Sequence, residues 1–107
     1  MIDTEQQILM MISSAGDSKA KAFEALRKVK EGDYNGARAL LKEAKEADLD
    51  AHKVQTALIS AELGGEGERP EMTLLMAHAQ DHYMTAQLAR DVIEELIDVF
   101  EARDARS

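Results

Sequence analysis

The sequence contains no cysteine and no tryptophan, and it has a single proline in 107 residues. Without cysteine there is no disulfide framework, no thiolate zinc site and no thiol nucleophile of the chain's own. Aromatic residues make up only 4% of the chain, whereas Ala, Glu, Leu and Lys, which favour helices, are abundant. This composition predicts an all-α fold.

Basic residues are also scarce, because 13 Lys and Arg stand against 21 Asp and Glu, a net charge of −8. Binding to nucleic acid or to an anionic membrane surface depends on Lys and Arg, so this deficit argues against both. A basic protein partner is compatible with it.

Long apolar runs are absent as well. No run approaches the roughly 18 residues of a membrane-spanning helix, and the first residues lack the charged-then-apolar pattern of a signal peptide. We therefore expect a soluble cytoplasmic protein without direct membrane insertion. The length suits one domain, residues 1–107, with a modest core that buries about two-thirds of the unfolded surface.

The spacing of apolar residues predicts three long helices joined by two connections. The first helix is expected to begin near Asp3 or Thr4 and to end before Gly32, which suits the left-handed position after a helix. Asp33 then suits the N-cap of the second helix. Because so short a connection makes its two helices antiparallel neighbours, the pattern favours an up-and-down bundle.

A glycine-rich loop separates the second helix from the third. The second helix is expected to run as one piece to about Leu63, and residues 64–70 then hold three glycines and the proline. The third helix is expected from about Glu71 to about Ala102, with Pro70 at its first position. We therefore predict an antiparallel up-and-down three-helix bundle.

The third helix carries two apolar strips, where a surface helix needs one. One strip is a seam with the heptad spacing of helices that pack along a shared axis. Its members are Leu74, His78, Asp81, Thr85, Leu88, Val92, Glu95 and Val99. The other strip comprises Met72, Leu75, Met76, Ala79, Tyr83, Ala86, Ile93, Ile97 and Phe100. Two strips predict two sets of neighbours, one within the chain and one outside it, so we expect an oligomer.

Polar side chains interrupt the middle of the seam, where Leu or Ile would be usual. His78, Asp81, His82 and Thr85 share one side of the helix. His78 has two readings, a hydrogen-bonded core residue or a nucleophile, since neutral imidazole attacks phosphorus well near pH 7. Together with Asp81, the two histidines also have the spacing of zinc ligands.

An oligomer axis along the seam would bring identical Asp81 carboxylates together. Buried like charges must bind a cation or take up protons, unless the end of the axis is open to water. The seam alone does not specify the number of copies.

The register of the predicted helices brings further polar residues to the same level. With the loop centred near Gly67, His78 lies at the level of Gln55, and His82 at the level of His52. The three histidines of the chain are therefore expected at one level of the bundle.

Two segments closely resemble the lactose/cellobiose-type enzyme IIA of the bacterial sugar phosphotransferase system. They are residues 51–56 (Ala-His-Lys-Val-Gln-Thr) and residues 74–85, which contain the run His-Ala-Gln-Asp-His. Residues 15–17 and 31–34 also look like signatures of this family, so the resemblance covers nearly the whole chain. Tyr83 departs from the leucine that is usual in the family.

This resemblance implies a fold, an activity and partners. The fold would be a three-helix bundle that assembles as a homotrimer, nine helices in all. His78 would accept a phosphoryl group from the phosphocarrier protein HPr and pass it to a cysteine of enzyme IIB, during uptake of a β-linked disaccharide such as cellobiose, chitobiose or lactose. Asp81 would meet its two copies around one Mg²⁺ on the trimer axis.

A phosphorylated histidine carries about two negative charges, so its site must supply hydrogen-bond donors. His82, Gln55 and Gln80 are candidates by register, although Gln80 falls on the solvent-facing arc of the helix. Two other functions stay open. One is a non-enzymatic helical interaction module, and the other is a metal-binding bundle that uses His78, His82 and Asp81.

Overall fold

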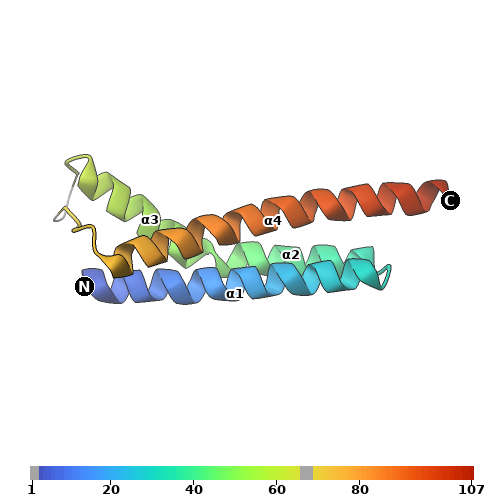
Figure 1. Ribbon diagram of the computed structural model, residues 1–107, viewed down its shortest axis with the longest axis horizontal. Helices are drawn as coiled ribbons and strands as arrows, with labels where there is room; N and C mark the ends of the chain where they lie inside the picture. The colour runs from blue at the N-terminus through green and yellow to red at the C-terminus, as the bar shows by residue number, and fades with distance from the viewer. Residues whose placement is uncertain (1–2, 66–68) are drawn as a thin grey trace.

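The computed structural model describes residues 3–65 and 69–107, which form three antiparallel rods (Figure 1). Its helices are α1 (Thr4–Lys30), α2 (Tyr34–Ala47), α3 (Leu49–Glu62) and α4 (Leu74–Arg106). Since α2 and α3 are two halves of one bent rod, the predicted all-α three-helix architecture is confirmed. The bundle measures 56 × 22 × 20 Å, and the loop centre predicted at Gly67 lies outside the described residues.

Local capping interactions determine the start of α1 and the connection between α1 and α2. The Asp3 side chain accepts a hydrogen bond from the Gln6 amide at 2.8 Å, and Asp33 accepts one from the Gly36 amide at 2.9 Å. Gly32 has a φ of 76°, a left-handed conformation that glycine adopts without strain. The predicted start of the first helix and the predicted turn are therefore confirmed.

Helix α4 begins at Leu74, later than the predicted start near Glu71. Thr73 is the cause, because its hydroxyl accepts a hydrogen bond from the Met76 backbone amide at 3.0 Å and so satisfies a free donor of the first turn. Pro70 therefore lies in the connection and does not begin the helix.

The middle rod is broken at Asp48, so the prediction of one unbroken helix to Leu63 was wrong. The local sequence does not predict this break, since residues 44–52 contain neither Gly nor Pro. The Asp48 amide donates to the Lys45 carbonyl at 3.3 Å, one residue short of α-helical spacing, and the Asp48 side chain bonds to Arg90. A tertiary contact therefore marks the bend, from which α3 leans away from the line of α2 (Figure 1).

Two apolar clusters fill the bundle, one in each half. The first joins α1, α3 and the start of α4 through Ile8, Met11, Ala51, Val54, Leu58, Met76, Ala79 and Tyr83. The second joins α1, α2 and the later part of α4 through Ala22, Ala25, Val29, Ala37, Leu41, Ala44, Ile93 and Ile97.

The two strips of α4 face opposite ways. The strip predicted to face its own chain is buried at Met76, Ala79, Tyr83, Ala86, Ile93 and Ile97. It is exposed at its two ends, where Met72 and Phe100 lie. The seam lies on the other side of the helix, where Leu74 is 88% and Leu88 62% exposed. The prediction of an inward strip is therefore confirmed, and the seam presents apolar surface to the outside.

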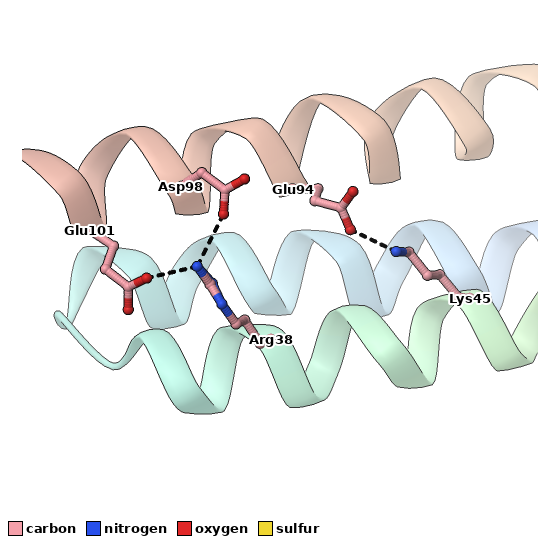
Figure 2. Close-up of polar contacts among 5 residues, drawn as sticks. All are labelled: Arg38, Lys45, Glu94, Asp98 and Glu101. Carbon is pink, nitrogen blue, oxygen red and sulfur yellow. Dashed lines mark hydrogen bonds and ion pairs between the residues drawn. The ribbon is translucent and has the colours of Figure 1, made fainter.

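Ion pairs tie α2 to the later part of α4 on the outside of the bundle (Figure 2). Lys45 bonds to Glu94 at 2.6 Å, and Arg38 bonds to Asp98 at 3.0 Å and to Glu101 at 2.7 Å. These side chains are between 42% and 58% exposed, so each pair contributes at most about 1 kcal/mol. The apolar clusters, not these pairs, hold the bundle together.

Within the described ranges, no helix combines the length and the apolar character that crossing a membrane requires.

Candidate functional site

Helix α4 places the two seam histidines in direct contact. The Nε2 atoms of His78 and His82 lie 3.1 Å apart, and their rings meet edge to face with centroids separated by 4.5 Å. His78 is exposed and His82 is half-buried. Two ring nitrogens at this distance share one proton, so the two imidazoles take complementary tautomers.

The surroundings of His82 indicate which ring donates. Its Nδ1 atom is buried and has no hydrogen-bond partner among the described residues. An unpaired buried N–H is the rarer and costlier arrangement, so we assign the proton of His82 to Nε2. His82 then donates to His78, whose Nε2 lone pair accepts. This neutral form of His78 is the one that a nucleophile requires.

The predicted level of the second helix against the third is confirmed. Gln80 Nε2 donates to Gln55 Oε1 at 2.7 Å, so Gln55 meets α4 between the two seam histidines. His52 Nδ1 lies 2.9 Å from the hydroxyl of Tyr83, the residue next to His82. Gln55 and His52 of α3 therefore lie at the level of the two histidines of α4, as predicted.

The glutamine pair and His78 lie on different sides of α4, however. At about 100° per residue, Gln80 points about 160° away from His78 around α4. Gln80 and its partner Gln55 therefore lie on the α3 side of the helix. Of the three residues predicted to stabilise a phosphoryl group, the chain by itself brings His82 into contact with His78.

Asp81 is exposed on the seam beside the histidine pair. In the part of the chain that the structure describes, no three His, Asp or Glu side chains are grouped to hold a metal ion. The zinc site that the sequence left open, with His78, His82 and Asp81 of one chain, is therefore not formed.

A buried polar group that was not predicted lies between the two apolar clusters. Arg90 donates to Ser18 Oγ at 2.8 Å and to Asp48 Oδ2 at 3.0 Å. Ser18 in turn donates to the carbonyl oxygen of Ala44 at 2.7 Å. The signal in the sequence was an arginine at an inward position of α4, where each neighbouring inward residue is apolar.

Burial also changes the acid–base chemistry of this region. It raises the pKa of the Asp48 carboxyl, and the neighbouring Arg90 guanidinium offsets part of that rise. Burial likewise raises the pKa of the Tyr83 hydroxyl, and the negative charge of Asp48 adds to the effect. Burying the Asp48–Arg90 ion pair therefore costs desolvation free energy, which lowers its net contribution to stability.

Comparisons with known proteins identify the family. Residues 6–101 match the family described as PTS system, lactose/cellobiose specific IIA subunit. The chain is 43% identical over 99 residues to the lichenan-specific phosphotransferase enzyme IIA component of Bacillus subtilis, which covers 92% of this chain and 88% of that one.

Solved structures agree with this match. The crystal structure of the PTS cellobiose-specific enzyme IIA from Bacillus anthracis superposes with a TM-score of 0.86 at 36% identity, covering 100% of this chain and 97% of that one. The chitobiose IIA solved in complex with HPr, from Escherichia coli, superposes with a TM-score of 0.77 at 32% identity, covering 97% and 99%. The chain therefore belongs to the lactose/cellobiose-specific IIA family and is a phosphoryl-carrier component of the sugar phosphotransferase system.

Proposed function

We propose that His78 is the phosphoryl acceptor of this carrier, that phosphorylated HPr is the donor and that a cysteine of enzyme IIB is the recipient. The observation that carries the assignment is the 3.1 Å contact between His78 and His82 on a side of α4 where the single chain leaves His78 exposed. The E. coli relative that was solved in complex with HPr supports HPr as the donor.

The pair suits in-line phosphoryl transfer. The Nε2 lone pair of His78 attacks phosphorus, and the new N–P bond forms as the bond between phosphorus and the donor breaks. The ring becomes positively charged and then loses its Nδ1 proton to water. In the second transfer, Nδ1 takes up a proton again and the cysteine sulfur attacks phosphorus. The N–P bond then breaks, and its electron pair returns to Nε2 of His78.

His82 is proposed as the first hydrogen-bond donor to the transferred group. Its Nε2–H now points at the nitrogen of His78 that would be phosphorylated. Once that nitrogen bonds to phosphorus, the same N–H is within reach of a phosphoryl oxygen. Gln55 and Gln80 point away from His78 in their own chain, so they would serve the phosphoryl group of a neighbouring copy.

A homotrimer built on the seam is part of the proposal. Its support is the heptad line of apolar side chains on the outer side of α4, where Val92 is 47% and Val99 49% exposed. Three copies of Asp81 would then meet on the axis. An all-oxygen donor set fits Mg²⁺ better than a soft metal, and one ion there would offset the repulsion of the carboxylates.

For the sugar we propose a β-linked disaccharide of the cellobiose or chitobiose type. The relatives named for lichenan, cellobiose and chitobiose support this class.

Labelling with phosphoenolpyruvate, enzyme I and HPr tests the proposal. We expect one phosphate per wild-type chain and none in the His78→Ala variant. Equal labelling of the alanine variant would show that another residue accepts the group. A wild-type chain that takes up no phosphate would instead favour the non-enzymatic interaction module.

A further inference from the structure

A polar layer crosses the bundle between its two apolar clusters. It consists of Ser18 from α1, Asp48 between α2 and α3, and Arg90 from α4. The three side chains are 0%, 5% and 8% exposed, and Oδ1 of Asp48 is buried without a partner among the described residues. Every rod of the bundle therefore contributes one member to a single buried network.

Stability alone does not favour such a layer. Removing two charges from water costs more than their attraction returns unless every lone pair is satisfied, and apolar side chains of similar size are often as stable or more so. The unpaired oxygen of Asp48 makes the balance worse. The layer is therefore expected to specify the shape of the fold.

The shape that it specifies is the bend in the middle rod. Asp48 is the residue at which α2 ends and α3 begins, and it is also the residue that Arg90 holds at 3.0 Å. No glycine or proline lies nearby to break the helix, so an inward-drawn side chain is the remaining cause.

The bend determines where α3 lies against α4. Two polar bridges join these helices, from Gln80 to Gln55 at 2.7 Å and between His52 and Tyr83 at 2.9 Å. Cavities of about 730 and 480 Å³ adjoin Gln55, and both are also lined by Ile59. Open space flanks these bridges, so apart from the apolar contacts of α3 in the first cluster, the position of α3 depends on the angle at which it leaves α2.

We propose that Asp48 and Arg90 are positioning residues, whose ion pair sets the angle of α3 and thereby holds Gln55 on Gln80 and His52 on Tyr83. The kinetic consequence rests on the proposed function. Gln55 is one of the residues proposed to stabilise the phosphoryl group, so a displaced α3 should slow phosphoryl transfer.

A double variant separates positioning from stability. Asp48→Leu with Arg90→Met replaces the buried pair by apolar side chains of similar size. The matched control, Lys45→Met with Glu94→Leu, removes an ion pair that joins α4 to the same rod but lies on the surface (Figure 2). Three properties are measured for both: the melting temperature, the nuclear Overhauser contact between the Gln55 and Gln80 amides, and the rate of phosphoryl uptake from phospho-HPr.

The double variant is expected to melt within about 4 °C of the wild type or above it. It should lose the Gln55–Gln80 contact and take up phosphoryl groups about tenfold more slowly, since small misplacements of supporting groups are costly. The surface control should keep the contact and the rate. A double variant that keeps both would overturn the proposal.

A second variant covers the case in which the double variant does not fold. Arg90→Lys keeps the charge but cannot reach Ser18 and Asp48 together with a planar fork. We expect a weakened Gln55–Gln80 contact and an intermediate rate, and wild-type values for both would contradict the proposal. If the wild-type chain takes up no phosphoryl group, the proposed function fails while the amide contact still decides the role of the ion pair.

Discussion

The Nε2 atoms of His78 and His82 lie 3.1 Å apart on one side of α4, where His78 is exposed and His82 is half-buried. The nitrogen proposed to attack phosphorus and the donor proposed to receive the phosphoryl oxygen are therefore already adjacent before any partner binds.

Replacing His82 tests this arrangement. We expect His82→Ala to lower the rate of phosphoryl uptake by about 10²-fold, because it removes a preorganised donor. His82→Gln supplies an N–H in a similar place and should recover part of the rate. Single-turnover uptake from phospho-HPr measures both variants, and an alanine variant as fast as wild type would show that His82 has no role at the phosphoryl group.

Asp81 should make the assembly depend on divalent cations. We expect a mass of three chains in solution, and we expect a chelator to shift the assembly toward monomers, because three carboxylates repel one another without a cation. Asp81→Asn removes the charges, so the chelator should have no effect on this variant. Sedimentation with a metal assay checks this, and equal sensitivity of both proteins would place the cation elsewhere.

The two faces of α4 predict opposite results for two apolar residues. Leu88 is 62% exposed on the seam and Ile93 is 3% exposed in the core. Leu88→Glu should therefore abolish the trimer and leave a folded chain. Ile93→Ala should lower the free energy of unfolding by about 2–5 kcal/mol. Light scattering and urea denaturation distinguish the two, and unchanged assembly of Leu88→Glu would remove the seam as the interface.

Removing Arg90 should make stability depend on pH. In Arg90→Met the buried Asp48 carboxyl loses the group that offsets the rise of its pKa, so its folded-state pKa lies well above the unfolded value. Stability is then greatest below about pH 4 and is lost as pH rises through the folded pKa. His52 is the other titratable neighbour whose charge acts on the Asp48 carboxyl, and the charge of Asp48 in turn raises the pKa of the Tyr83 hydroxyl.

At neutral pH we expect Arg90→Met to cost about 3–5 kcal/mol, the usual result of leaving a buried charge unpaired. Urea denaturation from pH 4 to pH 8 measures the effect. The Asp48→Leu, Arg90→Met double variant serves as the control, since it lacks the carboxyl and should show none of this pH dependence. A single variant with flat stability over this range would contradict the expectation.

Local chemistry was enough to predict the start of α1 and the first connection. Asp3, Gly32 and Asp33 act through neighbours within four residues, so the sequence around them contains the whole cause. The two strips of α4 were also predictable, since burial repeats with the helical period. The level of Gln55 against α4 followed from the hairpin.

The bend at Asp48 was not predictable in this way. Its partner Arg90 lies 42 positions away, and nothing near Asp48 disfavours the helix strongly. The contact of Gln55 with Gln80, which the sequence placed on the solvent-facing arc of α4, also depends on how the bent rod returns to α4. Long-range contacts decide both features, and a single sequence displays neither.

The position of the phosphate decides whether the imidazole pair of α4 is the chemical centre of this carrier. The phosphorylated chain, kept at alkaline pH where phosphohistidine survives, is examined by peptide mass spectrometry and by ³¹P–¹⁵N correlation. We expect one phosphate, bonded to Nε2 of His78. Phosphate on His52 or His82, or on Nδ1 of His78, would contradict this assignment.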